Sequence, residues 1–368
     1  HCSNPKSEVT CAQIVHAYRI LNGWAQYQNS SSFSDKRHFL MQHLYDGVGN
    51  RMSTDTATFV IALMDNRTYT VEAQHPSGNP SQGFGQAFDF HPAIKYRYGN
   101  DSAVNSYYDH NINNLYNIMT FDMWFNYDYN DIYPRHPNIY VNYLLFATMP
   151  YAHYQLGEFC FKHFGIHATY FICNYLMYIP DIAMKQAKAV VDTVPKSIVL
   201  FGVHLRYQEP NHFFSKDVHT TIKAIKRFLI DQNNKKPTVF ALATDSPLME
   251  RSFRMIFPNN TIATNALRIP DADHLSALYD IALLEYCQKY LLTYRSTFSY
   301  IVAARTAKRA YFVEKESPDV FDISNSQSSM ISMVYHQFDV NDWQVSRRFH
   351  ITPHGEYILR RYYLSFLL

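Results

Sequence analysis

From about residue 197 to residue 313 the sequence repeats one pattern, in which a short apolar run of strand length precedes a stretch with helical periodicity. The run at 197–203 is continuous and apolar, as expected of a strand buried in a parallel sheet. Further strands are expected at 237–244, 290–293 and 310–313, and helices at 217–233, from Pro247, at 273–287 and at 296–305. Strands that alternate with helices form a doubly wound parallel sheet, so the pattern predicts a Rossmann-like α/β domain.

Polar residues follow three of these strands. His204 and Arg206 come after the first, Asp245 after the second, and Ser296 with Thr297 after the third. Doubly wound sheets bind ligands at the carboxyl ends of their strands, so we expect these side chains at one ligand-binding edge.

The arginine and the hydroxyls of this edge suit a phosphorylated ligand. A guanidinium can grip a diphosphate bidentately, although Arg206 can also pair with a nearby carboxylate such as Glu209. Ser296 and Thr297 can donate hydrogen bonds to the same phosphates or serve as an ordinary helix cap. Asp280 can bind a nucleobase edge or simply face solvent.

The N-terminal half contains one strand–turn–helix–strand unit, with strands at 39–45 and 68–72 and a helix at 54–65. The turn Gly47-Val48-Gly49-Asn50-Arg51 offers backbone N–H groups to an anion at a helix start, or is a plain tight turn. It lacks the third glycine of a dinucleotide fingerprint and the lysine of a P-loop. Residues 75–155 appear irregular and aromatic, which fits a sugar-binding groove or a core built from tyrosine and phenylalanine.

Length and composition indicate a globular chain with two domains. The 368 residues are 47% hydrophobic and 17% charged. The net charge is +2 and basic runs do not exceed a triplet, which argues against a nucleic-acid binder. We expect a stem or N-terminal helix at 1–35, domains at 36–190 and 191–335, and a helical tail at 336–368. No apolar run is long enough to span a bilayer, so a membrane attachment would depend on an anchor removed before His1.

Four asparagines fit the N-glycosylation sequon, which suggests the secretory pathway: Asn29, Asn66, Asn100 and Asn259. The cysteine spacings allow Cys2–Cys11 and Cys160–Cys173 disulfides. A rival interpretation takes Cys160, His163, His167 and Cys173 as zinc ligands. Asp271-Ala272-Asp273 has the form of a metal-binding Asp-x-Asp, or of acidic residues at a helix start.

Three patches together resemble one family. Asp46-Gly-Val-Gly-Asn-Arg51, Gly202-Val-His-Leu-Arg206 and the segment from Asp280 to Ala303, which contains Ser296-Thr-Phe-Ser299, are similar to segments of a fucosyltransferase superfamily. This superfamily includes the plant cell-wall α1,2-fucosyltransferases and the α1,6- and protein O-fucosyltransferases. The sequence departs from the usual pattern at Tyr207 and Glu209, and at Ala303-Ala304-Arg305.

The resemblance implies a GT-B fold, with two Rossmann-like domains facing a cleft, and metal-independent, inverting transfer of fucose from GDP-fucose to a glycan. Resemblance to the plant enzymes favours α1,2 transfer to galactose in the Golgi lumen. The donor would contact His204, Arg206, Asp280, Ser296, Thr297 and Phe298 together with Gly47, Val48, Gly49, Asn50 and Arg51. Glu209, Asp46 and Asp217 are the candidates for a general base. A transferase with another nucleotide sugar and a non-catalytic carbohydrate-binding protein are the alternatives.

Overall fold

A computed structural model of the chain shows two compact units, divided between Tyr178 and Ile179. The structure describes residues 9–30, 32–43, 48–73, 89–97, 102–111, 116–118, 136, 138–142, 154–206, 218–232, 236–263, 273–293, 296–308, 310–313 and 320–322. Unit 1 contains Val9–Tyr178 and unit 2 contains Ile179–Ser329.

Unit 1 is built on a parallel five-stranded sheet in the order β4-β2-β1-β6-β5. Its strands are β1 (His38–His43), β2 (Thr68–Ala73), β4 (Lys95–Arg97), β5 (Tyr116–Ile118) and β6 (Asn138–Asn142), and β3 (Asp89–Phe90) pairs antiparallel with β7 (Met177–Tyr178). Its helical segments are α1 (Cys11–Ser30), η1 (Phe33–Asp35), α2 (Val48–Met64), α3 (Ser102–Asn111), α6 (Tyr154–Phe164), η6 (Gly165–His167) and α7 (Ala168–Leu176).

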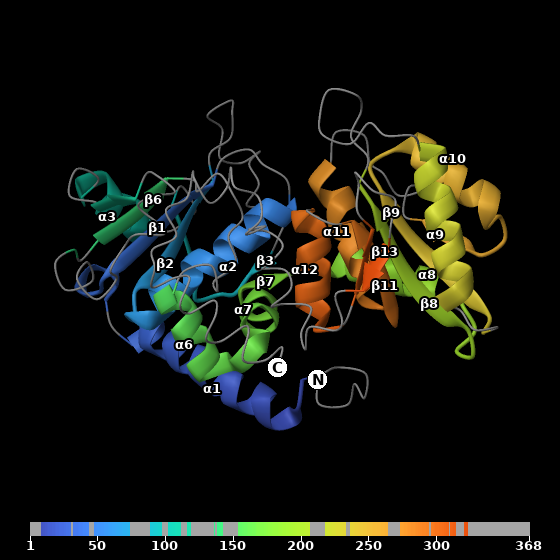
Figure 1. The fold of residues 1–368 in the computed structure, drawn as a ribbon. Coiled ribbons are helices and arrows are strands. Elements are labelled where there is room, and N and C mark those ends of the chain that lie inside the picture. The colour runs from blue at the N-terminus through green and yellow to red at the C-terminus, as the bar shows by residue number, and fades with distance from the viewer. Residues whose placement is uncertain are drawn as a thin grey trace. The chain divides into compact units, whose positions relative to one another are not determined.

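Helix α2 is buried on almost every side because it lies between the sheet and a second layer of helices. It contacts β1 and β2 on one side and α6 and α7 on the other, while α1 packs on α6 and α7 (Figure 1). Some of its polar side chains form hydrogen bonds within unit 1, whereas the buried Ser53 hydroxyl has no hydrogen-bond partner in the described chain. Asp55 accepts a hydrogen bond from the Tyr69 hydroxyl at 3.0 Å, and Thr58 lies 2.7 Å from the same hydroxyl. Burial, followed by the Asp55 charge, raises the pKa of Tyr69 well above its ordinary value.

Unit 2 is built on a six-stranded sheet in the order β10-β9-β8-β11-β12-β13, which is the Rossmann order 3-2-1-4-5-6 with an antiparallel last strand. The strands are β8 (Val199–Leu205), β9 (Thr238–Thr244), β10 (Thr261–Ala263), β11 (Lys289–Thr293), β12 (Tyr311–Val313) and β13 (Val320–Asp322). The helices are α8 (Asp181–Val191), α9 (Val218–Gln232), α10 (Pro247–Ile256), α11 (Asp273–Glu285) and α12 (Thr297–Thr306).

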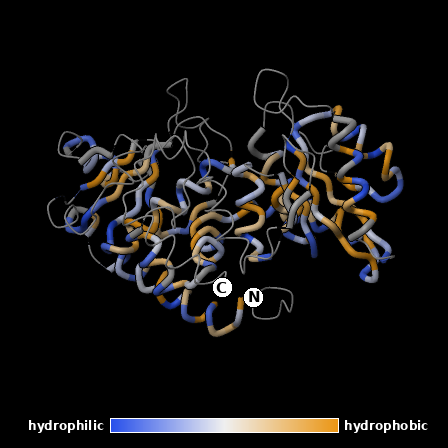
Figure 2. Tube along the Cα trace, viewed as in Figure 1, coloured by the Kyte–Doolittle hydropathy of each residue, from blue (hydrophilic) through white to orange (hydrophobic). Residues whose placement is uncertain are grey.

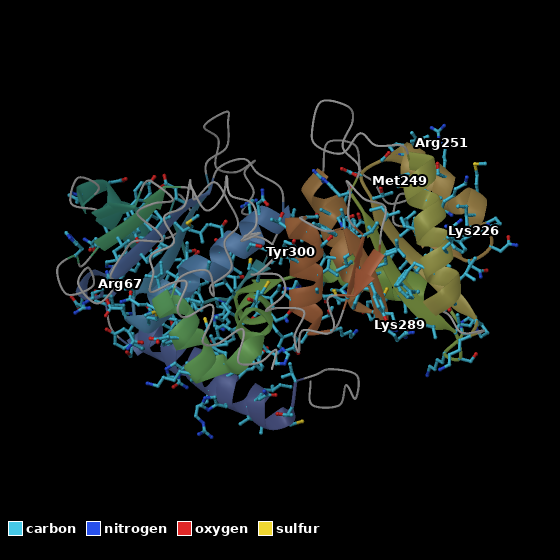
Figure 3. All side chains as sticks on the ribbon, in the orientation of Figure 1. Arg67, Lys226, Met249, Arg251, Lys289 and Tyr300 are labelled. Carbon is cyan, nitrogen blue, oxygen red and sulfur yellow. The ribbon has the colours of Figure 1, made fainter. Side chains whose placement is uncertain are left out.

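Helices cover both faces of this sheet, with α9 and α10 along one face and α11 and α12 along the other (Figure 1). Figure 2 shows hydrophobic residues along the strands and hydrophobic residues alternating with hydrophilic ones along the helices. Alternate residues of β8 point to opposite faces. Phe201, Val203 and Leu205 join the core with α9 and α10, whereas Gly202 faces α11. Met249 of α10 is buried against the sheet, and Arg251 on the same helix is exposed (Figure 3).

Most elements expected from the sequence are present with shifts of one or two residues, and the Ser246 hydroxyl caps α10 as expected, accepting a hydrogen bond from Met249 N at 3.3 Å. Two expectations need correction. The helix expected at 54–65 begins at Val48, so Val48–Arg51 form its first turn and not a preceding loop. Residues 75–155 also contain regular structure, including α3 and β4–β6, and Tyr108 is part of the core there.

The unit boundary lies earlier than the one expected at 190/191. Helix α8 packs on α11 and therefore belongs to unit 2. The segment expected as a stem or an N-terminal helix contains α1, whose Leu21 and Trp24 are buried. The expected tail at 336–368 lies outside the described residues.

The structure describes four of the five cysteines, and it describes helices in which a membrane span could be sought. Cys160 and Cys173 are both buried and form no disulfide with each other, so that predicted pairing is wrong. Cys2, one half of the other predicted pair, lies outside the described residues. Burial raises the pKa of the Cys160 and Cys287 thiols. Within the described ranges, no helix has both the length and the apolar character that a bilayer crossing requires.

Candidate functional site

The strand order of unit 2 reverses between β8 and β11. The chain runs from β8 to β9 and β10 on one side, then returns to β11 and continues to β12 on the other. A crevice forms at such a switch point, beyond the carboxyl ends of the two strands, because the helices that follow them go to opposite faces. Lys289 marks the amino end of β11 (Figure 3), so Thr293 lies at the opposite, ligand-binding end.

Two threonines, each the last residue of its strand, fix the carboxyl end of β8. The Thr293 hydroxyl donates to the His204 carbonyl at 2.8 Å and accepts from the Arg206 backbone N–H at 2.9 Å. From the other neighbouring strand, the Thr244 hydroxyl donates to the Leu205 carbonyl at 2.7 Å. The backbone from His204 to Arg206 is therefore held from both sides, just where the strand ends.

Arg206 is a partly exposed cation whose guanidinium has more N–H donors than the described residues occupy. Its Nε lies 3.1 Å from Asp245 Oδ2, and the side chain remains 39% exposed. Asp245 is therefore the ion-pair partner of Arg206 in the described chain. The partner that the sequence suggested as an alternative, Glu209, lies outside the described residues. The guanidinium has five N–H donors, and those of its two terminal nitrogens have no partner in the described part of the chain. An anion is the ligand that such a group binds best.

His204 is held beside Arg206 by contacts to α12. Its Nδ1 lies 2.7 Å from Ser299 Oγ, which also accepts the Thr293 backbone N–H at 3.1 Å. The Phe298 ring lies 4.5 Å from the imidazole, centroid to centroid. His204 is only 5% exposed, so its ring is fixed by the end of β11 and the first turn of α12.

The first turn of α12 is a second source of hydrogen-bond donors. Ser296 occupies the N-cap position, and its carbonyl accepts from Tyr300 N at 3.1 Å, but its hydroxyl makes no capping bond. The amide groups of a helix start and its dipole favour an anion. Thr297 and Phe298, the first two helical residues, are partly buried.

Asp280 lies on α11 and is 9% exposed, so its side chain does not face solvent freely as one alternative held. The structure thus brings His204, Arg206, Ser296, Thr297 and Phe298 to one edge of the unit 2 sheet and leaves Asp280 on the helix before it.

In unit 1 the described members of the predicted donor-binding turn lie at the start of α2, beyond the carboxyl end of β1. Val48, Gly49 and Arg51 are buried and Asn50 is partly buried. The other predicted residues of this region, Asp46 and Gly47, lie outside the described residues, as does the further base candidate Asp217.

The metal alternatives gain no support from the described side chains. Among them, no three His, Cys, Asp or Glu residues are grouped so that they could hold an ion, although Cys160, His163, His167 and Cys173 are all described. Asp271 lies outside the described residues. Asn29, Asn66 and Asn259 are exposed, and Asn100 is not described.

Thr244, Thr293 and Ser299 were missed by sequence reasoning, and Asp245 was placed at the edge without a role. The two threonines carry a usable signal, since each ends an otherwise apolar strand. Ser299 belongs to the Ser296-Thr-Phe-Ser299 segment that carried the family resemblance. Its contact with His204 joins residues 95 positions apart, which no local pattern reveals.

Comparison with known proteins finds likeness in three-dimensional structure alone. No protein-family model and no curated protein matches the sequence. A mutant of Arabidopsis thaliana FUT1 in complex with GDP has a TM-score of 0.59 at 11% identity, covering 87% of this chain and 83% of that one. The fucosyltransferase NodZ from Bradyrhizobium has a TM-score of 0.50 at 17% identity, covering 78% and 99%. NodZ α-1,6-fucosyltransferase co-crystallized with GDP has a TM-score of 0.50 at 17% identity, covering 78% of this chain and 98% of that one. At these identities the likeness concerns the fold, and the chain has the α/β fold of these fucosyltransferase structures.

Proposed function

We propose that the protein is a glycosyltransferase that transfers fucose from GDP-fucose to a glycan hydroxyl, with inversion and without a metal ion. The observation that carries this proposal is Arg206, a cation held at the switch point of a Rossmann-ordered sheet with unpaired terminal nitrogens in the described chain. Support comes from the shared fold with structures solved in complex with GDP. The resemblance of the Gly202–Arg206 segment to the fucosyltransferase superfamily also supports GDP-fucose as the donor.

The chemistry assigned to the site is a single displacement. The oxygen of the acceptor hydroxyl attacks the anomeric carbon, the bond from that carbon to the β-phosphate oxygen breaks, and its electron pair leaves with GDP. Arg206 and the amide groups at the start of α12 would stabilise the charge that grows on the diphosphate. The hydroxyl proton passes to a base or to solvent, and Glu209, Asp46 and Asp217 remain the candidates for that base.

The finer assignments follow from the resemblance. An α1,2 linkage to galactose is the expected product, and the chain is expected in the secretory pathway, either as a type II membrane protein of the Golgi lumen or as a secreted protein. A transferase for another nucleotide sugar would share the phosphate-binding edge but select a different base. A carbohydrate-binding protein would bind glycan and not GDP.

Nucleotide-dependent thermal stabilisation tests the proposal. A ligand that binds the native state at 100 times its Kd stabilises it by about 2.7 kcal/mol. We expect GDP to raise the melting temperature, with or without EDTA, and UDP, ADP and CMP to leave it unchanged. Arg206→Ala should abolish the GDP shift.

Arg254→Ala is the matched control for this variant. Arg254 belongs to the same unit, its Nε lies 2.8 Å from Glu250, and its side chain is 41% exposed, close to the values for Arg206. It should keep the full GDP shift. A shift with UDP would support the other transferase, and the lack of any nucleotide shift would support the binding protein.

A further inference from the structure

The Ser299 hydroxyl lies between two groups of the candidate site. Ser299 is fully buried as the third residue of α12. Its Oγ lies 2.7 Å from His204 Nδ1 and 3.1 Å from the Thr293 backbone nitrogen. These two contacts are its hydrogen bonds within the described chain, so each of its lone pairs and its single proton can be assigned.

A backbone N–H can only donate, so the Ser299 oxygen accepts from Thr293. A hydroxyl has one proton and two lone pairs, and the proton needs an acceptor because the group is buried. His204 Nδ1 is the acceptor within reach. A ring protonated at Nδ1 would instead donate to Ser299 and leave the buried hydroxyl proton unpaired, which is unfavourable.

We infer that Ser299 is a positioning residue that holds His204 in the neutral tautomer with its proton on Nε2. The Phe298 ring, 4.5 Å from the imidazole, restricts the same side chain from a second direction. The inference rests on the proposed function only for the identity of the ligand, since the hydrogen bonds exist in the protein alone.

This tautomer determines what His204 can do for a nucleotide sugar. The lone pair on Nδ1 is engaged by Ser299, and Nε2 carries a proton. In this tautomer Nε2–H is the donor of the ring, and the imidazole has no free lone pair with which to take the acceptor's proton. The general base must be sought among the carboxylates.

The tautomer can be read from the protein without ligand. In protein labelled with ¹⁵N-histidine, long-range ¹H–¹⁵N correlations distinguish the two neutral tautomers and the imidazolium, and His204→Gln identifies the signals of His204. We expect an unprotonated Nδ1 and a protonated Nε2 near neutral pH. In Ser299→Ala, the Nδ1 resonance should move to the position of a nitrogen without a hydrogen bond, and Ser299→Thr should restore it.

Ser246→Ala is the matched control, since it removes a buried serine hydroxyl that also accepts from a backbone N–H in unit 2. It should leave the His204 resonances in place. A protonated Nδ1 in the wild-type protein, or an unchanged Nδ1 resonance in Ser299→Ala, would overturn the inference.

GDP affinity then separates this inference from the proposed function. Loss of one positioned hydrogen bond should weaken GDP binding by about tenfold in Ser299→Ala, with recovery in Ser299→Thr. If wild-type protein shows the expected tautomer but does not bind GDP, the positioning role stands and the assigned function fails. If Ser299→Ala loses the Nδ1 hydrogen bond and keeps full GDP affinity, the role in donor binding is wrong.

Discussion

His38 is a titratable side chain that the fold keeps neutral. Its ring is fully buried in unit 1, 4.1 Å from Tyr107 and 4.4 Å from Phe33 between ring centroids. Burial is the main reason that its pKa falls to about 3, and the charges of Lys36 and Arg67 lower it further. A histidine in the unfolded chain titrates near its ordinary value of 6.5.

We expect the stability of unit 1 to depend on pH through this residue. Above pH 6.5 His38 is neutral in both states, and as the pH falls from 6.5 towards 3 only the unfolded chain gains the proton. The free energy of unfolding should therefore drop by about 2 kcal/mol at pH 5. Urea denaturation at pH 7, 6 and 5 measures the drop, and His38→Phe should reduce it.

His110→Gln, which replaces an exposed histidine of α3, is the control for the loss of a histidine in the same unit. A His38→Phe variant with the same pH dependence as the wild-type protein would show that His38 is not the group responsible.

At the scale of elements, α11, β11 and the segment between them pack so closely on β8 that one position has no room for a side chain. A Cβ on Gly202 would lie 2.9 Å from Leu284 Cδ2 and Tyr290 Cδ1, and 3.2 Å from Cys287 Cβ. The Tyr290 ring has little freedom to move, because its hydroxyl donates to the carbonyls of Leu284 at 3.0 Å and Cys287 at 3.1 Å.

Gly202→Ala should therefore destabilise unit 2 by about 1–3 kcal/mol, as overpacked cores do. Thermal or urea denaturation measures the loss. The matched control is Gly23→Ala on α1, where a Cβ meets nothing within 4 Å, and it should be neutral or stabilising by about 0.4–1 kcal/mol. Equal effects of the two substitutions would show that the close packing at Gly202 is unimportant.

The same elements show what the sequence could and could not predict. The strands and helices of unit 2 were predictable because β8 and β9 are continuous apolar runs and α10 carries its own cap at Ser246. Positions at strand ends were predictable too, since the parallel order brings them to one edge. That reasoning predicted that His204, Arg206 and Ser296 lie at the same edge of the unit 2 sheet, as the structure has them.

Contacts between distant side chains were not predictable. The Arg206–Asp245 pair joins residues that directly follow two neighbouring strands, β8 and β9. The His204–Ser299 bond joins the end of β8 to helix α12, so it depends on how that helix packs on the sheet. The start of α2 was missed because Gly49 is a poor helix former, yet the helix begins at Val48, where packing in the interior of unit 1 outweighs local propensity.

At the scale of the whole molecule, the exposed sequons allow a test of the proposed compartment. Asn29, Asn66 and Asn259 lie at the surface, and Asn66 adopts a left-handed φ of 49° just after α2. In a chain translocated into the endoplasmic reticulum we expect these asparagines to carry glycans. Expression behind a secretory leader should give a mass that falls after treatment with an N-glycosidase.

Asn29→Gln and Asn259→Gln should each remove one glycan, and the same chain made in the cytosol provides the unglycosylated reference mass. A translocated chain whose mass the glycosidase does not change would contradict the proposed compartment.

Two of the hydrogen bonds that assemble the unit 2 site join residues far apart in the chain. His204 and Ser299 are 95 positions apart, and Arg206 and Thr293 are 87 apart. Such contacts close long loops and form after local structure during folding. During synthesis on a ribosome, the carboxyl end of β8 can form these contacts only after most of unit 2 has been made. Nucleotide binding would then appear only in fully folded protein, so a nucleotide column would separate native chains from partly folded ones.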